Sequence, residues 1–431
     1  MNPCLGIYVH IPFCESKCDY CNFASGVYPD SMVSPYLAAL REEILGVKGL
    51  LAGLEATPLH FDHFEVDSVY FGGGTPSLID GRHIVNLMRL LGEVFVLSPK
   101  TEVTLEVNPG SANRARVREH LAAGVNRISV GMQTFQNRLL QQIGRSHTVA
   151  DSFSTLAFYR EAGIDNASLD LIAGLPGQMP ADWSENLETV QRLSPEHVSM
   201  YLLEIHEGTR FGQLYGDLAK RGQTRQASSV PPNHGELTGG AAEDRFQDSS
   251  SPPGPGRRPE LIPLPDEEIV TQFYSEAVAR FAELGYQQYE ISNFAQPGRQ
   301  SRHNLKYWTD QPFFGFGCGA YSYFGGKRWG NERSVNRYIE RIREQQHAID
   351  YRSDVTLKES EEEAIFLGLR LTKGIPLPGF QSRFGTDLLE RYRGQIAYLR
   401  EAGLIEFNSD HLRLTPQGWL LSNEVFTELL R

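Results

Sequence analysis

Short apolar runs alternate with longer amphipathic runs from residue 8 to about residue 205. This alternation predicts βα units that build a parallel sheet. The candidate strands are the apolar runs at 5–11, 68–71, 102–107, 127–130, 167–171 and 198–203. The candidate helices lie between them, at 35–51, 81–94, 112–123, 150–162 and 183–193. Six such units are too few to close an eight-stranded barrel, so the pattern predicts an α/β fold with a partial, open (β/α)6 barrel.

A segment that follows the barrel differs from it in composition. Residues 222–265 are rich in Gly, Ser and Pro, and eight of the chain's 24 prolines lie between Pro231 and Pro265. Such a composition cannot bury enough apolar surface to order itself, so we expect a disordered insertion. Order is expected to return with an amphipathic helix at 266–284 and an edge strand at 286–295.

The last part of the chain has the pattern of a small α+β unit. From about residue 355 it shows helices, then short strands around a turn, then a final helix. This order is typical of a winged-helix unit. The expected domains are a barrel at 1–215, an insertion at 216–265, a barrel-completing region at 266–350 and a C-terminal winged-helix-like domain at 351–431.

The charge of the chain changes what this last unit is expected to bind. The net charge is −12, and residues 355–431 hold 9 Lys and Arg against 11 Asp and Glu. A nucleic-acid partner requires a basic surface, so we expect no nucleic acid and a packing or partner-docking role for the unit. No apolar run reaches the ~18 residues of a membrane span and no basic leader is evident, which predicts a cytoplasmic protein.

Three of the chain's five cysteines, Cys14, Cys18 and Cys21, are crowded into one short segment. A disulfide framework would need more thiols, so the crowding favours a metal site. Zinc is one candidate, with Cys4 or His10 as a fourth ligand, although zinc modules usually show two separate ligand pairs. An iron–sulfur cluster is favoured, since three thiolates leave one iron of a cubane with an open position.

Polar side chains also stand at or near the ends of the predicted strands. In a parallel barrel these ends meet at one edge, which is the edge where the cysteine segment leaves the first strand. The alternative interpretation of a glycine run at such a place is a tight turn, and that of a single polar side chain is a salt bridge or a loop cap. Taken together these residues indicate a ligand site, and they are the glycines at 72–74, Thr75, Glu106, Gln133, Arg145 and Asp170.

The spacing Cys-x3-Cys-x2-Cys, with Tyr20 just before the last cysteine, resembles the cluster loop of radical S-adenosylmethionine (SAM) proteins. The preceding Tyr-Val-His-Ile-Pro-Phe resembles the branch that contains oxygen-independent coproporphyrinogen III oxidases and HemW-type heme chaperones. The resemblance implies a 4Fe-4S cluster on Cys14, Cys18 and Cys21, with SAM chelated at the open iron. It further implies SAM contacts from Tyr8, Tyr20, Gly73, Gly74, Thr75, Glu106, Gln133, Arg145 and Asp170.

A second motif lies in the region 266–350. His303-Asn304-Leu305-Lys306-Tyr307-Trp308 resembles the segment associated with heme binding in the chaperones, which implies that His303 ligates heme. A structural histidine with its hydrogen bonds satisfied is the alternative interpretation. Cys318 is a rival axial ligand, although its glycine-rich setting also suits a small buried thiol.

The resemblance leaves a carrier and an enzyme to be distinguished. In the family, coproporphyrinogen dehydrogenases have another cysteine two residues after the last cluster cysteine and a long N-terminal arm, whereas this chain has Phe23 there and no such arm. We therefore expect a heme carrier that binds the cluster, SAM and heme, takes electrons from a donor and passes heme to an acceptor protein. The alternatives are a coproporphyrinogen III dehydrogenase that forms protoporphyrinogen IX, and a radical enzyme with an unrelated substrate.

Overall fold

Six parallel strands form the centre of the protein. The structure is a computed structural model and describes residues 3–54, 63–220 and 261–431. All six predicted strands are present, and they pair in sequence order. They are β1 (Cys4–Ile11), β2 (Glu65–Gly73), β3 (Val96–Val107), β4 (Arg127–Gln133), β5 (Ala167–Ala173) and β6 (His197–Leu202).

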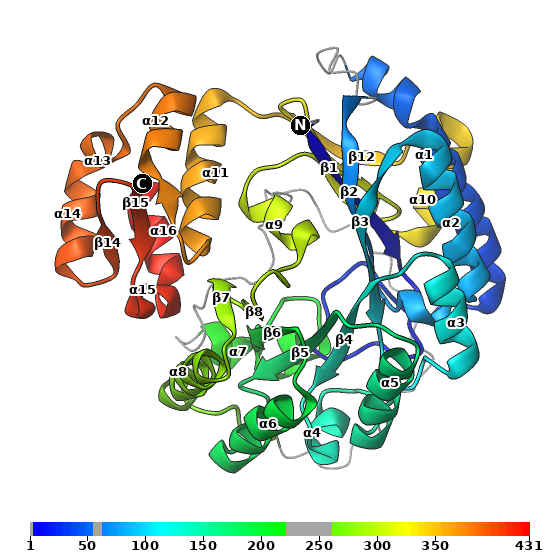
Figure 1. Ribbon diagram of the computed structural model, residues 1–431, viewed down its shortest axis with the longest axis horizontal. Coiled ribbons are helices and arrows are strands. Elements are labelled where there is room, and N and C mark those ends of the chain that lie inside the picture. The colour runs from blue at the N-terminus through cyan, green and yellow to red at the C-terminus, as the bar shows by residue number, and fades with distance from the viewer. Residues whose placement is uncertain (1–2, 55–62, 221–260) are drawn as a thin grey trace.

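Helices cover the outer face of these strands (Figure 1). The five predicted helices are α1 (Val33–Gly53), α2 (Gly81–Val94), α3 (Arg114–Ala122), α5 (Val149–Glu161) and α6 (Pro180–Leu193). Polar caps fix where several of them begin. Asp80 accepts a hydrogen bond from the N–H of Arg82 at the start of α2, and Thr148 and Asp151 form a capping box on α5. Two short helices were not predicted, α4 (Asn137–Gln142) and α7 (Arg210–Lys220).

The chain after the insertion extends the sheet at both ends. Beyond β6 it adds α8 (Glu267–Glu283), β7 (Gln287–Glu290) and β8 (Asn293–Ala295). The single edge strand expected at 286–295 is therefore a hairpin, because the Glu290 carboxylate accepts the N–H of Ser292 and holds a turn there. Beside β1 it adds α9 (Arg302–Trp308), β9 (Phe313–Phe316), β10 (Tyr321–Phe324), β11 (Lys327–Asn331), α10 (Val335–Gln345) and β12 (Ile349–Asp354).

The resulting sheet is open, as the sequence predicted. Its described part has 12 strands in the order β12-β11-β10-β9-β1-β2-β3-β4-β5-β6-β8-β7. The order does not return on itself, and β9 pairs parallel to β1 while β10, β11 and β12 are antiparallel. The strand that leads into the cysteine segment is therefore central in the sheet instead of lying at its edge.

The C-terminal domain has the predicted winged-helix-like order and its own apolar core. It lies beside the barrel, and α11 packs on α9 (Figure 1). Its short strands form a separate sheet in the order β13-β15-β14. The elements are α11 (Leu357–Arg370), β13 (Ile375–Pro376), α12 (Leu377–Phe384), α13 (Leu388–Arg391), α14 (Arg393–Glu401), β14 (Ile405–Phe407), β15 (His411–Leu414), α15 (Pro416–Leu420) and α16 (Ser422–Leu429).

The predicted insertion lies mostly outside the described residues. Helix α7 continues to Lys220, beyond the expected start of the insertion at 216, and residues 221–260 are not described. The four domain boundaries remain predictions. In the described ranges, each helix is too short or too polar to cross a lipid bilayer.

A buried carboxyl group joins the first helix to the late strands. Glu43 of α1 accepts hydrogen bonds from the N–H of Gly317 at 2.8 Å, the hydroxyl of Tyr338 at 2.6 Å and the amide of Asn331 at 2.5 Å. Burial nevertheless raises the pKa of Glu43 from 4.5 to about 7. The folded protein therefore favours the protonated acid.

We expect this group to make stability depend on pH. Because the folded pKa lies above the unfolded one, its contribution is complete below pH 4.5 and is lost as the pH rises to about 7. The loss should be on the order of 3 kcal/mol. Thermal unfolding of wild type and Glu43→Gln can be measured across this pH range. The unfolding temperature of the wild type should fall relative to that of the variant as the pH rises. Parallel curves would contradict the assignment.

Candidate functional site

A cavity of about 520 Å³ lies where the six parallel strands end. It is lined by every residue to which the family resemblance assigns a contact with the cluster, SAM or heme. The cluster loop after β1 and the ends of the following strands supply part of the wall, and α9, the strands β9 to β11 and α11 supply much of the rest. The predicted residues in this lining are Tyr8, Cys14, Cys18, Tyr20, Cys21, Gly73, Gly74, Thr75, Glu106, Gln133, Arg145, Asp170 and His303.

Each thiol of the cluster loop has a hydrogen-bond donor beside it. The Thr75 hydroxyl lies 3.8 Å from the sulfur of Cys14, and the Arg145 guanidinium lies 3.5 Å from that of Cys18. The Lys17 ammonium lies 3.7 Å from the sulfur of Cys21. A sulfur that binds a metal as a thiolate can accept hydrogen bonds from such donors.

The loop fits the thiolate ligands of an iron–sulfur cluster. Burial raises the pKa of the Cys14 thiol, but a bound metal ion deprotonates a coordinating thiol outright. Among the described residues, no group of three or more His, Cys, Asp and Glu is placed to hold a single metal ion. In a cluster each cysteine binds a different iron.

Neither residue considered as a fourth zinc ligand is placed for that role. Cys4 opens β1, at the opposite end of the strand from the cluster loop. His10 uses both ring nitrogens, since its Nε2 lies 2.9 Å from the carbonyl of Ala24 and its Nδ1 lies 3.1 Å from the Tyr8 hydroxyl. A carbonyl only accepts, so Nε2 carries the proton and the Tyr8 hydroxyl donates to Nδ1.

The glycine run after β2 is required by space and by backbone conformation. A Cβ at Gly73 would lie 2.4 Å from the His10 ring, and the φ angle of Gly73 is +113°. A Cβ at Gly74 would lie 2.7 Å from the backbone of Pro12. The run therefore allows the second strand to approach the cluster loop closely.

Two partly buried carboxyl groups face the cavity. Glu106 accepts hydrogen bonds from the Tyr70 hydroxyl at 2.9 Å and the N–H of Gly73 at 3.0 Å. Burial, with Asp170 nearby, raises the pKa of Glu106 to about 7. Asp170 accepts from the Ser129 hydroxyl at 3.0 and 3.1 Å, and burial raises its pKa as well. Both groups can accept hydrogen bonds from a ligand when ionised.

Arg145 and Gln133 complete this part of the cavity. The Arg145 guanidinium donates to the carbonyl of Gly131, and its Nε is buried without a hydrogen-bond partner in the described part of the chain. Such a group suits a carboxylate ligand. Gln133 ends β4 with a φ angle of +65°, which is rare for a residue with a side chain and common at binding sites.

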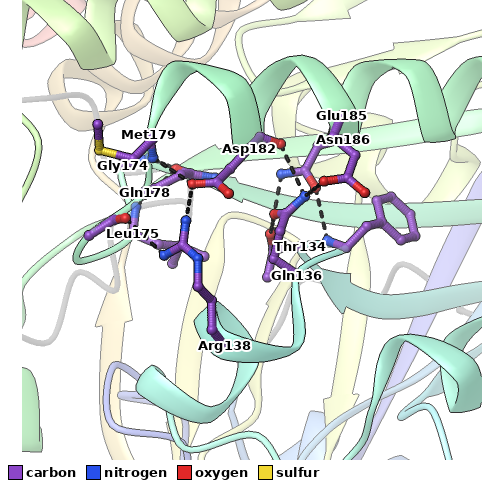
Figure 2. A network of polar contacts seen from close by, with 12 residues as sticks. Thr134, Gln136, Arg138, Gly174, Leu175, Gln178, Met179, Asp182, Glu185 and Asn186 are labelled. Atoms are coloured by element: carbon purple, nitrogen blue, oxygen red, sulfur yellow. Dashed lines mark hydrogen bonds and ion pairs between the residues drawn. The ribbon is translucent and has the colours of Figure 1, made fainter.

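A polar network holds the loops after β4 and β5 (Figure 2). The Asn186 side chain on α6 accepts the N–H of Phe135 at 2.8 Å. Gln178 accepts the N–H groups of Gly174 and Leu175 at 2.7 and 3.2 Å. Asp182 pairs with Arg138. These bonds fix the loops that follow Gln133 and Asp170.

His303 lies in the cavity wall with both ring nitrogens occupied. Its Nδ1 lies 3.1 Å from the Ser68 hydroxyl and its Nε2 lies 2.9 Å from the Tyr307 hydroxyl. Burial lowers the pKa of His303 to about 3, so the ring is neutral. Cys318 is fully buried beside Tyr36 and does not line the cavity.

The sequence did not reveal every residue of the cavity. Tyr70 and Ser129 lie two positions before Gly72 and Gly131 on their strands, so the alternation of side chains could have found them. Glu363, Phe366 and Leu367 come from α11 of the C-terminal domain. Local patterns carry no signal for a contact between domains.

Comparison with known proteins shows to which family the chain belongs. The radical SAM superfamily model matches residues 8–190, and the HemN C-terminal domain model matches residues 355–421. The chain is 33% identical to heme chaperone HemW of Bacillus subtilis over 98% of both chains. It is 30% identical to heme chaperone HemW of Lactococcus lactis, over 98% of this chain and 96% of the relative. The chain belongs to the HemW family.

A solved structure shows the same fold as this HemW family member. Coproporphyrinogen III oxidase from Escherichia coli, described as a radical SAM enzyme, matches with a TM-score of 0.75 and 22% identity. The match covers 99% of this chain and 90% of that one. Family and fold class are confirmed, and radical SAM membership implies the cluster and SAM. The roles of individual residues remain predictions.

Proposed function

We propose that this protein is a heme chaperone that binds a 4Fe-4S cluster, SAM and heme, and delivers heme to an acceptor protein. The observation that supports this most is the similarity to HemW chaperones over nearly the whole chain. An electron donor for the cluster is a second expected partner. The few cysteines suit a reducing compartment, so we place the protein in the cytoplasm.

Different groups in the cavity would bind the cluster and SAM. Cys14, Cys18 and Cys21 would hold the cluster, whose open iron supplies a binding point for the amino and carboxylate groups of SAM. Arg145 would bind the SAM carboxylate, and Asp170 would accept hydrogen bonds from its ribose hydroxyls. The remaining predicted contacts surround them in the same wall, at Tyr8, Tyr20, Gly73, Gly74, Thr75, Glu106 and Gln133.

The heme cargo would use the part of the cavity nearer the C-terminal domain. Tyr307, Phe313 and Phe366 give this part an aromatic lining, which suits a flat macrocycle. Helix α9 supplies Tyr307 and packs against α11, which supplies Phe366. The cavity volume of about 520 Å³ lies within the range of roughly 300 to 1,000 Å³ found for small-molecule sites.

The enzyme alternative has less support. The likeness to coproporphyrinogen III oxidase at 22% identity concerns the fold. Phe23, at the position where the dehydrogenases have a further cysteine, is 52% exposed. The relatives from Bacillus subtilis and Lactococcus lactis, at 33% and 30% identity, are named as heme chaperones.

One experiment separates the two functions. Protein reconstituted without oxygen should bind heme with a stable Soret band and pass it to an acceptor apoprotein. The same protein with coproporphyrinogen III, SAM and a reductant should form no protoporphyrinogen IX, while coproporphyrinogen III oxidase from Escherichia coli serves as the positive control. Product formation by this protein would overturn the proposal.

A further inference from the structure

Tyr307 and His303 form a hydrogen-bonded pair on helix α9, and both line the cavity. They are four residues apart, so they lie on the same face of the helix. The Tyr307 hydroxyl lies 2.9 Å from Nε2 of His303. His303 is only 1% exposed, whereas Tyr307 is partly exposed, so Tyr307 is the member of the pair that a ligand reaches first.

The imidazole of His303 is held in place by its other contacts. Its Nδ1 faces the Ser68 hydroxyl at 3.1 Å. Its ring lies against Tyr70, at 5.3 Å between ring centroids, and against Tyr8, at 6.3 Å. Direct coordination of a metal by Nε2 would require the Tyr307 hydroxyl to leave, and the surrounding rings oppose a turn of the imidazole.

Tyr307 itself is held by an aromatic neighbour. Its ring meets Phe313 edge to face, with 4.7 Å between centroids. This contact fixes the direction of the phenol without using its oxygen. The hydroxyl oxygen keeps lone pairs for a metal ion while its proton points to the imidazole.

We propose that the phenolate oxygen of Tyr307 is the axial ligand of ferric heme, with His303 as a positioning residue that hydrogen-bonds this oxygen. The proposal rests on the proposed heme-binding function and deepens it. Tyrosine is one of the known protein ligands of heme iron. A second residue that orients the ligand atom is the usual companion of a metal ligand.

Binding of the phenolate would be a ligand exchange at the ferric iron with no change of oxidation state. The oxygen–iron bond forms as the phenol loses its proton to solvent and a water molecule leaves the ferric iron. His303 stays neutral by moving its own proton from Nδ1 to Nε2, from which it donates to the phenolate. The Ser68 hydroxyl allows this change because it can either accept from Nδ1 or donate to it.

The test is spectroscopic and uses the full chain. Ferric heme is titrated into wild type, Tyr307→Phe, His303→Gln and Tyr323→Phe. Tyr323 is a matched control, since it is another tyrosine in the cavity lining. Resonance Raman spectra report phenolate ring vibrations only when a tyrosine binds the iron.

We expect phenolate bands in wild type and in Tyr323→Phe. Tyr307→Phe should lose them and bind heme at least roughly ten-fold more weakly. His303→Gln should keep the bands at shifted frequencies, because the glutamine amide can still donate to the phenolate. This shift would not arise if His303 merely supported the fold.

Other results would overturn the proposal. If Tyr307→Phe keeps the wild-type spectrum and affinity while His303→Gln loses heme, the histidine is the ligand. If Tyr307→Phe fails to fold, as judged by circular dichroism, the wild-type Raman spectrum decides alone, and absent phenolate bands contradict the inference. Wild-type protein that binds no heme at all would instead refute the proposed function.

Discussion

Replacing any one of Cys14, Cys18 and Cys21 by serine should remove the visible absorption of the cluster and nearly all bound iron. Each sulfur faces the same cavity and has its own donor, so each is expected to hold a different iron. Loss of a ligand should lower metal retention at least roughly ten-fold, because even loss of a supporting residue costs that much. Iron and sulfide analysis after reconstitution without oxygen measures the effect.

The remaining two cysteines are the matched controls. Cys4 is exposed at the far end of β1 and Cys318 is fully buried outside the cavity, so serine at either position should leave the iron content unchanged. Loss of iron from Cys4→Ser would contradict a three-cysteine cluster. Stoichiometric zinc in freshly purified protein would contradict an iron–sulfur site altogether.

Removing either member of the Glu290–Arg370 pair should destabilise the protein by about 3–5 kcal/mol. The two side chains lie 3.6 Å apart, are at most 1% exposed, and link the β7–β8 hairpin to the end of α11. Burial raises the pKa of Glu290 and lowers that of Arg370, so burial disfavours the charged form of each group. The attraction between the two groups opposes this effect, and each charge is therefore stabilised by the other. Denaturant unfolding of Glu290→Ala and Arg370→Met measures the cost.

A double variant separates the cost of leaving one buried charge unpaired from the contribution of the pair itself. Glu290→Gln with Arg370→Met removes both charges, keeps an acceptor for the N–H of Ser292, and should cost far less than either single change. Arg413→Met is the control, because Arg413 and Glu406 form an exposed pair worth about 0–1 kcal/mol. Single variants as stable as the control would show that the pair contributes nothing.

The parallel core could be predicted because its signals are local. Each of the six strands is a short apolar run beside an amphipathic helix, and this pattern is complete within about 30 residues. The strands β9 to β12 left no such signal. They are short, and β9 contains Gly315, whose Cβ would lie 2.1 Å from the carbonyl oxygen of Tyr321. The pairing that joins them to the parallel core is that of β9 with β1, which lies some 300 residues earlier in sequence.

The site was predictable to a similar extent. Residues that end parallel strands must share one edge, so Glu106, Gln133 and Asp170 could be placed together from their positions alone. The bonds that His303 makes could not be read in this way. Its partner Ser68 lies 235 positions earlier in the chain, on a strand whose register only the folded sheet defines.

The central place of β1 has a consequence for how the protein is made. One neighbour of this strand, β2, leaves the ribosome early, but the other, β9, begins only at Phe313. Helix α9, which forms part of the cavity, is also synthesised in the last third of the chain. The three thiols of a nascent chain are thus exposed to solvent long before α9 and β9, which complete the cavity, have been synthesised. Cofactor loading should therefore follow the completion of synthesis, and the emerging thiols need a reducing environment until then.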